Sequence, residues 1–284
     1  MRRLGSIVIA VVAVATAGLA DTAAERRPVA AGAAVTVALD RGEVSVVGID
    51  RAVLEMESDV PLAVDGDRDA VTVAPAPGHA GRAAVIELRV PRGCELEVRT
   101  VTAEIWVDRF EGDLTVRTVA GPVRIDGTPR RVQVEGVSGD LVLDVPTDEA
   151  QIAWENGDVD VRGVRRSLRC EVTRGDVAIA TDRRLADLTC RVISGDVAIA
   201  GPVPADADWT VDTQMGDVIV QLAEPADAQL EVTTAVGSIV SDLVDRTDHR
   251  SEVPGPQESR TLIAGDGQGR VRVTVLTGDV IVRR

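Results

Sequence analysis

The chain has 284 residues, a net charge of −15 and 45% hydrophobic residues, so it is a globular chain that can bury a large core. Lysine is absent, and the excess of acidic residues argues against nucleic acid or anionic lipid as a partner. Aromatic residues make up only 1% of the sequence, whereas Val and Ala dominate, which suits thin stacked sheets with little room for rings.

The N-terminal segment, residues 1–20, has the layout of a secretory signal peptide. Arg2 and Arg3 precede an apolar run from Ile7 to Ala17, and small residues follow as far as Ala20. This run is too short for a comfortable membrane span, and no later segment is apolar enough to cross a bilayer. We expect cleavage after Ala20 and an extracytoplasmic location, in the periplasm, at the cell surface or secreted. An uncleaved signal anchor is the alternative.

Residues 28–98 are expected to form an N-terminal β cap or sheet. Segments such as Ala33–Leu39 and Ala83–Val90 alternate as strands do, and they are separated by turn signals such as Asp65-Gly66-Asp67. Within this region, Gly42–Val46 is a diverged copy of the repeat that follows. A solenoid needs such an atypical end, because a bare terminal coil exposes unpaired backbone.

Residues 99–284 are dominated by an internal repeat of 18 to 21 residues. CEVTRGDVAIA at Cys170–Ala180 returns as CRVISGDVAIA at Cys190–Ala200. Each period also holds a second, five-residue strand pattern without the Gly-Asp pair, so each coil consists of two strands. The glycines that open Gly-Asp units are Gly112, Gly139, Gly157, Gly175, Gly195, Gly216 and Gly278.

The repeat predicts an all-β fold, a β-solenoid of stacked two-strand coils. Alternation with period two places Val177 and Ile179 on one face of their strand. One unit cannot bury that face alone, whereas copies stacked on one another form a continuous core. We therefore expect Val177, Val197 and Val218 to lie in one buried column.

The C-terminal part departs from the repeat and then returns to it. Residues 242–268 are polar and contain prolines, so they are expected to be a loop insertion. The closing copy ends at Val280–Val282, which we expect to be an edge strand at the end coil. Self-association through this end coil is one consequence, although Arg283 and Arg284 would guard the edge against it.

Val90-Pro91-Arg92-Gly93, followed by strands ending in Gly-Asp-apolar units, resembles the bacterial putative-adhesin β-strand-repeat family. This family is a group of mostly exported domains of unknown function with Gly-Asp repeats. The resemblance covers residues 33–284, including the Gly265–Gly269 turn before the closing Thr277–Val280 copy. It implies a β-solenoid or sandwich-like repeat fold and no established enzymatic activity, so it offers no catalytic residues to carry over.

A column of aspartates is the sharpest candidate site. Asp140, Asp158, Asp176 and Asp196 occupy equivalent positions, and strands in register lie about 4.8 Å apart. A calcium-stabilised β-roll is one alternative, but one Asp per coil cannot supply the six to eight oxygens of a calcium site. We expect instead that each glycine takes a positive φ at the corner while its Asp hydrogen-bonds the turn backbone.

Other polar groups form no recognisable catalytic or metal-binding pattern. The carboxylate pairs Asp158/Asp160 and Asp206/Asp208 would suit a polysaccharide-cleaving β-helix, but nothing supplies the cleft that such a dyad needs. His79 and His249 have no metal-ligand spacing. The paired arginines are expected to solubilise turns, with a basic stripe for an acidic glycan as the alternative; they lie at 130–131, 165–166 and 183–184.

Cysteines and tryptophans are assigned to the core. Cys170 and Cys190 share one repeat position, so they are expected to be stacked neighbours, either as a disulfide or as buried thiols. Cys94 lies in a turn. The tryptophans follow the apolar pattern and are expected to be buried or to close the ends of coils; they are Trp106, Trp154 and Trp209.

These patterns lead to one functional hypothesis, an exported non-catalytic structural or interaction protein of the cell envelope that is adhesin-like. It is not expected to be an enzyme, and no catalytic, cofactor-binding or metal-binding residue is assigned. The expected partner is a protein or glycan of the cell envelope, not nucleic acid, and no membrane span is expected after removal of the signal peptide. A polysaccharide-binding or polysaccharide-cleaving β-helix is the alternative, and a calcium-stabilised β-roll is a further one.

Overall fold

A computed structural model describes residues 23–180, 185–246 and 257–284, so the expected signal peptide lies outside the described residues. Within that part, no helix is long and apolar enough to cross a membrane. The regular structure there is all strand apart from one 3-10 turn, η1 (Pro77–His79), which confirms the expected all-β class.

The strands are, in chain order, β1 (Ala23–Pro28), β2 (Ala34–Ile49), β3 (Val53–Ser58), β4 (Leu62–Gly66), β5 (Ala70–Pro75), β6 (Ala83–Pro91), β7 (Glu95–Phe110), β8 (Asp113–Ala120), β9 (Val123–Gly127), β10 (Arg131–Ser138), β11 (Leu141–Asp144), β12 (Glu149–Asn156), β13 (Val159–Arg162), β14 (Ser167–Arg174), β15 (Val177–Ala180), β16 (Asp187–Ser194), β17 (Val197–Pro202), β18 (Asp208–Met215), β19 (Val218–Ala223), β20 (Ala228–Val236), β21 (Ile239–Ser241), β22 (Val244–Asp245), β23 (Glu258–Ala264), β24 (Gly269–Thr277) and β25 (Val280–Arg283).

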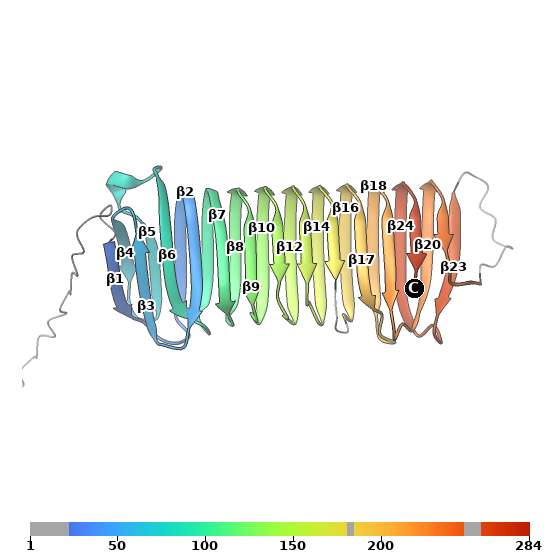
Figure 1. The fold of residues 1–284 in the computed structure, drawn as a ribbon, viewed down its shortest axis with the longest axis horizontal. Helices are drawn as coiled ribbons and strands as arrows, with labels where there is room; N and C mark the ends of the chain where they lie inside the picture. Colours follow the sequence, from blue (N-terminus) through green and yellow to red (C-terminus); the bar gives the residue numbers. More distant parts are fainter. Residues whose placement is uncertain (1–22, 181–184, 247–256) are drawn as a thin grey trace, which may run out of the picture.

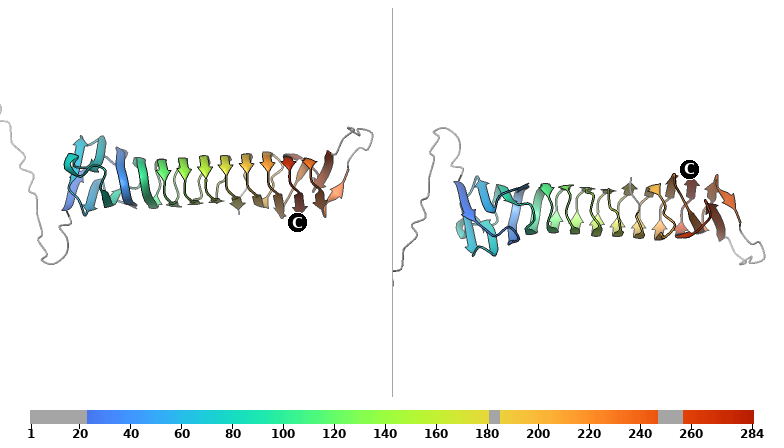
Figure 2. Two further views of the ribbon diagram at one scale, coloured as in Figure 1. Left: turned by 90° about the horizontal axis from the view of Figure 1, so that it is seen from above. Right: turned by 90° about the horizontal axis from the view of Figure 1, so that it is seen from below.

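The coils stack into two parallel layers that run the length of the molecule (Figures 1 and 2). The long-strand face contains, in spatial order, the first half of β2, the first half of β7, β8, β10, β12, β14, β16, β18, β24 and β20. The short-strand face contains the second halves of β2 and β7, followed by β9, β11, β13, β15, β17, β19, β25 and β21. Each coil contributes one strand to each layer, which confirms the predicted β-solenoid of two-strand coils.

The core lies between the two layers and consists of columns of equivalent side chains. Val177 pairs in register with Val197, and Val197 pairs with Val218. All three side chains are buried, which confirms the predicted column. Because each coil presents the same apolar positions, burial of one coil depends on its two neighbours.

Antiparallel strands close the stack at both ends. At the N-terminal end, β3 pairs antiparallel with both β1 and β6, and β4 pairs antiparallel with β5. The Arg27 side chain donates hydrogen bonds to the carbonyl oxygens of Val64 and Gly66 on β4. At the C-terminal end, β23 pairs antiparallel with β20. The repeat therefore stops where the strand direction changes, which prevents a further parallel coil from adding in the same way.

The first part of the expected cap also contributes to the solenoid. The second half of β2 lies between β6 and β7 and pairs in parallel with both. Strand β7 itself runs through residue 98, where the cap was expected to end, and turns from the long-strand face to the short-strand face. The N-terminal segment therefore supplies one coil of the stack as well as its closing strands.

The last coil is not at the end of the stack. Strand β24 lies between β18 and β20, and β25 lies between β19 and β21. In Figure 1 the C-terminus lies inside the row of strands, and β23 stands at its end. The prediction that Val280–Val282 is an edge strand was therefore wrong. Part of the expected loop insertion, Glu258–Ala264, forms the strand that occupies the end instead.

Candidate functional site

The corner aspartates form a ladder of hydrogen bonds along the solenoid. Oδ1 of Asp158 accepts the backbone N–H of Asp176 at 3.0 Å, and Oδ1 of Asp176 accepts that of Asp196 at 2.9 Å. The preceding Gly175 has a φ of +139°, as expected for the corner. The carboxylates thus bind backbone, as the turn interpretation predicts, but the donor belongs to the next coil. In spatial order the ladder comprises Asp140, Asp158, Asp176, Asp196, Asp217 and Asp279.

The two carboxylate pairs do not form dyads. Asp158 belongs to the corner ladder, whereas Asp160 lies on β13 and forms an ion pair with Arg162 at 2.7 Å. This hydrogen-bonded carboxylate raises the pKa of the Arg162 guanidinium. Asp206 lies in an exposed turn, and Asp208 is the exposed first residue of β18. Neither pair faces across a cleft, as glycoside hydrolysis requires.

The histidines give no metal site in the part of the chain that the structure covers. His79 ends η1, and its Nδ1 atom is buried without a hydrogen-bond partner among the described atoms. His249 lies outside the described residues. Within the described ranges, no three or more His, Cys, Asp or Glu side chains are grouped to hold a metal ion.

The turn arginines alternate with carboxylates and do not form a basic stripe. Arg130 pairs with Asp113 at 3.3 Å, and Arg131 pairs with Glu149 at 3.0 Å. Residues 183–184 lie outside the described residues. A depression of about 370 Å³ at the start of the long strands is lined by Asp113, Arg130, Arg131, Asp148, Glu149, Arg166 and Ser167.

The three cysteines are buried free thiols. Cys170 and Cys190 are in register on β14 and β16, in the column that Val134 and Val211 occupy in other coils. The hydrogen bond between the two thiols and their burial raise the pKa of Cys170. Burial also raises the pKa of Cys94, to about 12. Cys94 and Cys170 are therefore protonated at neutral pH, and burial shields all three thiols from reagents.

The tryptophans differ in a way that the sequence pattern does not show. Trp154 and Trp209 are buried, as expected, and their Nε1 atoms donate to the carbonyl oxygens of Gly139 and Leu185. Trp106 is 44% exposed, so its predicted burial was wrong. On the second half of β7 its neighbours in the alternation point inward, which leaves the Trp106 ring on the outer surface.

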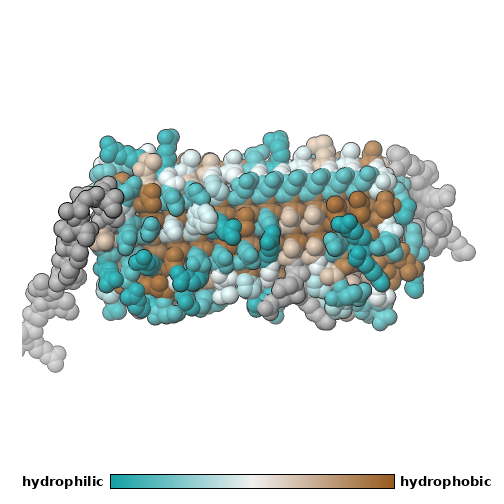
Figure 3. Space-filling view, viewed as in Figure 1, coloured by the Kyte–Doolittle hydropathy of each residue, from teal (hydrophilic) through white to brown (hydrophobic). Residues whose placement is uncertain are grey.

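A groove with a volume of about 1160 Å³ lies on the long-strand face. It follows three consecutive positions of β8, β10, β12, β14, β16, β18 and β24, and it extends to parts of β7 and β20. Because it crosses eight strand spacings, it runs about 38 Å along the solenoid axis. We call this groove the axial groove. Figure 3 shows the opposite, short-strand face, on which apolar side chains also form a band along the axis, beside a row of hydrophilic ones.

The middle position of each strand forms the floor of the axial groove. Its side chains point into the core and are buried, as Thr118 and Trp154 are. Gly136 lies between them in the column, and a Cβ atom there would overlap the Trp154 ring. The small glycine therefore makes room for the one large ring of the floor.

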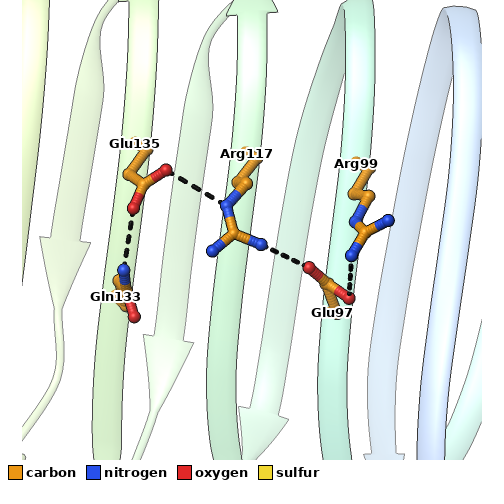
Figure 4. A network of polar contacts seen from close by, with 5 residues as sticks. All are labelled: Glu97, Arg99, Arg117, Gln133 and Glu135. Carbon is orange, nitrogen blue, oxygen red and sulfur yellow. Dashed lines mark hydrogen bonds and ion pairs between the residues drawn. The ribbon is translucent and has the colours of Figure 1, made fainter.

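The positions on either side of the floor form two unlike walls. One wall carries exposed aliphatic side chains, among them Val119, Val137, Ile193 and Leu276. The other wall carries charged side chains, and Figure 4 shows how they are paired. Arg117 donates to Glu97 and to Glu135, the second at 3.1 Å. The wall is therefore a chain of ion pairs and not a patch of one sign.

The charge wall contains a carboxyl group with a perturbed pKa. The Gln133 amide donates to Glu135 at 2.7 Å, and Arg117 donates to the same carboxylate. These hydrogen bonds lower the pKa of Glu135, the amide being the larger cause. The aspartate column, which the sequence analysis favoured, lies outside the axial groove. Sequence reasoning missed this groove, whose only signal is the aliphatic residue at outward positions such as Val119 and Ile193.

One comparison with known proteins identifies the family. The Toastrack DUF4097 family model matches residues 35–283. Among curated proteins, none matches the chain. The solved structures that are similar share little sequence with it, and at their TM-scores they carry no argument about function.

Three of these structures come from Parabacteroides distasonis and Bacteroides fragilis. A putative adhesin from Parabacteroides distasonis ATCC 8503 is 10% identical over 93% of this chain and 97% of that chain, with a TM-score of 0.37. A putative adhesin from Bacteroides fragilis NCTC 9343 is 11% identical over 93% and 97%, with a TM-score of 0.34. A putative lipid binding protein from Parabacteroides distasonis ATCC 8503 is 12% identical over 93% and 96%, with a TM-score of 0.33.

The family match agrees with the resemblance that the Gly-Asp repeats carry, and it covers both the strands before residue 99 and the solenoid after it. The chain is a member of the Toastrack DUF4097 family.

Proposed function

We propose that the protein is an exported, non-catalytic interaction module of the cell envelope that binds its partner in the axial groove. The single observation behind this proposal is the groove itself, which combines an exposed aliphatic wall with a wall of paired charges. Exposed aliphatic side chains that line up in one concavity are typical of binding surfaces. The described carboxylates, thiols and His79 offer no arrangement for catalysis, which favours binding over reaction.

The location is part of the same proposal. The layout of residues 1–20 favours export, and the repeat family resembled by the sequence consists mostly of exported proteins. A long, rigid stack of coils suits this role, because it presents one continuous surface without needing to change shape.

Binding to envelope fractions tests the proposal. The mature protein is incubated with isolated cell-envelope material, and the bound fraction is compared with that of the double variant Val137→Glu/Ile193→Glu. Both residues lie on the aliphatic wall at 37% and 44% exposure, so the substitutions leave the core intact. The control is Val240→Glu, at a valine that is 57% exposed on β21 of the short-strand face.

We expect the wild type and the control to bind alike and the groove variant to lose at least nine-tenths of its binding. If the groove variant binds as well as the wild type, or if the wild type does not bind, the proposal is wrong. Circular dichroism and melting curves of the three proteins confirm that each is folded.

A further inference from the structure

We propose that the axial groove holds the acyl chain of a lipid with an uncharged head group, extended along the solenoid axis. This inference rests on the proposed function, since it names the chemistry of the partner that the groove binds. The groove is straight, because the same three positions of successive coils form it. Its length of about 38 Å, at the usual strand spacing, suits a linear chain better than a compact ligand.

The floor offers no backbone groups to a ligand. Thr118 pairs in register with Thr100 on one side and with Gly136 on the other, and the remaining floor residues of the inner strands are paired in the same way. In such a ladder the N–H and C=O groups point along the axis and are already used. A peptide lying along the groove would leave its own N–H and C=O groups without partners, whereas a hydrocarbon chain has none to satisfy.

The charged wall is neutral as a whole. Arg117 is shared by Glu97 and Glu135, and Arg191 lies 3.6 Å from Glu171 and 3.7 Å from Asp212. The groove-lining charges of this wall are three arginines and three carboxylates, namely Arg99, Arg117, Arg191, Glu135, Glu171 and Asp212. A charged polymer would have to break these pairs, so the wall complements an uncharged occupant. The net charge of −15 further disfavours an anionic head group.

The aliphatic wall supplies the attraction. Val119, Val137, Ile193 and Leu276 are 37% to 56% exposed, and covering them with hydrocarbon removes apolar surface from water. A glycan fits the groove less well, because sugar rings favour exposed aromatic platforms and the one ring here, that of Trp154, is buried in the floor.

The wall is interrupted by polar side chains at three outward positions, Glu155, Thr173 and Gln214. Glu155 and Gln214 are exposed and occupy the same column as Val119 and Ile193. Glu155 is the one charged residue on this side of the described groove. Because Glu155 has Val137 on one side and Gln214 lies between Ile193 and Leu276, leucine at both positions would extend the apolar wall without touching the core. The inference therefore predicts a variant that binds more tightly as well as one that binds less tightly.

The test uses a dibrominated monoacylglycerol, an uncharged single-chain lipid whose bromine atoms quench tryptophan fluorescence on close approach. The mature wild-type protein is titrated below the concentration at which the lipid aggregates. We expect saturable quenching, because Trp154 lines the groove whereas Trp106 and Trp209 do not. Displacement of the bromine-labelled lipid by its unlabelled form measures the affinity.

Three variants define the site. We expect Val137→Glu/Ile193→Glu to weaken binding at least tenfold and Glu155→Leu/Gln214→Leu to tighten it severalfold. Val240→Glu, on the other face, should change the affinity less than twofold.

The inference is overturned if quenching does not saturate, if the groove variants bind like the control, or if leucine at the two positions does not tighten binding. Capture of an apolar peptide or a neutral glycan by the groove, without capture of the monoacylglycerol, also overturns it. In either case the envelope-binding test still decides the proposed function separately, because that test depends on the groove and not on the class of ligand.

Discussion

The carboxylate of Asp176 accepts the backbone N–H of Asp196 from the next coil at 2.9 Å, although 20 residues separate them. The same bond links Asp217 to Asp279 at 2.8 Å across 62 residues. Each aspartate therefore fastens one coil to its neighbour in space, whatever the order of the coils along the chain. The column is therefore a structural seam between coils.

The hydrogen bond of the seam predicts that Asp176→Ala and Asp176→Asn change the stability of the protein by different amounts. Asp176→Ala removes the acceptor and should lower the free energy of unfolding by about 1 kcal/mol. Asp176→Asn keeps an oxygen acceptor and relieves repulsion between stacked carboxylates, so it should change stability by less than about 0.5 kcal/mol. Urea unfolding of both variants measures this. Equal losses in the two would show that charge and not the hydrogen bond matters at this position.

Calcium gives the control for that experiment. Since the carboxylate oxygens already accept backbone N–H groups, melting temperatures measured with calcium and with a chelator should agree for the wild type. A shift of many degrees would restore the calcium β-roll interpretation of the Asp column.

Gly175 should be intolerant of any side chain. Its φ is +139°, and a Cβ atom there would overlap the carbonyl oxygen of Gly157 in the neighbouring coil. Gly175→Ala should therefore cost more than about 1 kcal/mol, measured by urea unfolding. Gly78→Ala is the matched control, because a Cβ atom at Gly78 meets nothing within 4 Å. Similar stabilities of the two variants would contradict the close stacking of the corners.

Val280 should behave as a core residue and not as part of a fraying terminus. It lies in register between Val218 and Ile239 and is fully buried. Val280→Asp should cost about 3 kcal/mol or more, because the carboxylate would have no partner in the core. Val218→Asp should cost as much, whereas Val240→Asp, at an exposed site, should be nearly neutral. A small loss of stability for Val280→Asp alone would indicate that the last coil lies at the end of the stack and not between two other coils.

The Glu135 carboxyl should titrate below the ordinary glutamate value of about 4.3. Its pKa is lowered by hydrogen bonds from Gln133 and Arg117, so the folded state binds its proton less readily than the unfolded state does. The resulting stabilisation is complete above the unfolded pKa and is lost as the pH falls through the lower folded pKa. Carbon-13 NMR titration of the Glu135 carboxyl measures the midpoint.

Substitutions separate the causes of that shift. Gln133→Ala should raise the Glu135 midpoint, because it removes the larger cause. Gln151→Ala, the equivalent change on β12, should leave the midpoint in place, since Gln151 donates to Glu149 instead. No difference between the two variants would assign the shift to Arg117 alone.

The cysteines should resist alkylation until the protein unfolds. Burial raises the pKa of Cys94 to about 12, and burial together with the Cys190 hydrogen bond raises that of Cys170. Iodoacetamide at pH about 8 should therefore add nothing to the native protein and three groups to the protein in urea, as counted by mass spectrometry. A single addition in urea would show that Cys170 and Cys190 are joined by a disulfide.

Much of the architecture is readable from periodicity. Strands with period two and a coil repeat of 18 to 21 residues require equivalent residues to stack, and Val177, Val197 and Val218 do so. The turn role of the glycines was equally predictable, because a corner that passes close to the next corner leaves no room for a Cβ atom. A column of equivalent buried side chains requires only local alternation and a constant repeat length, and both are visible in a single sequence.

The order of the coils required the tertiary structure. Val271 and Val280 carry the same pattern as every other coil, so nothing local distinguishes a place at the end from a place between β18 and β20. The insertion depends on how residues 242–268 connect the two coils and on β23, which closes the end with the opposite strand direction.

The axial groove and the exposure of Trp106 also depend on the tertiary structure. Alternation predicts which side chains leave the core, but it does not predict how the sheet bends, so Val119 and Ile193 could not be recognised as one wall of a concavity. The apolar neighbours of Trp106 suggested a core position. On β7, however, those neighbours are the buried residues of the alternation, so the Trp106 side chain points outward. Local pattern therefore determined the stacking, since stacking repeats the same contact in each coil. Curvature and coil order arise from contacts between distant segments, and only the folded chain brings those together.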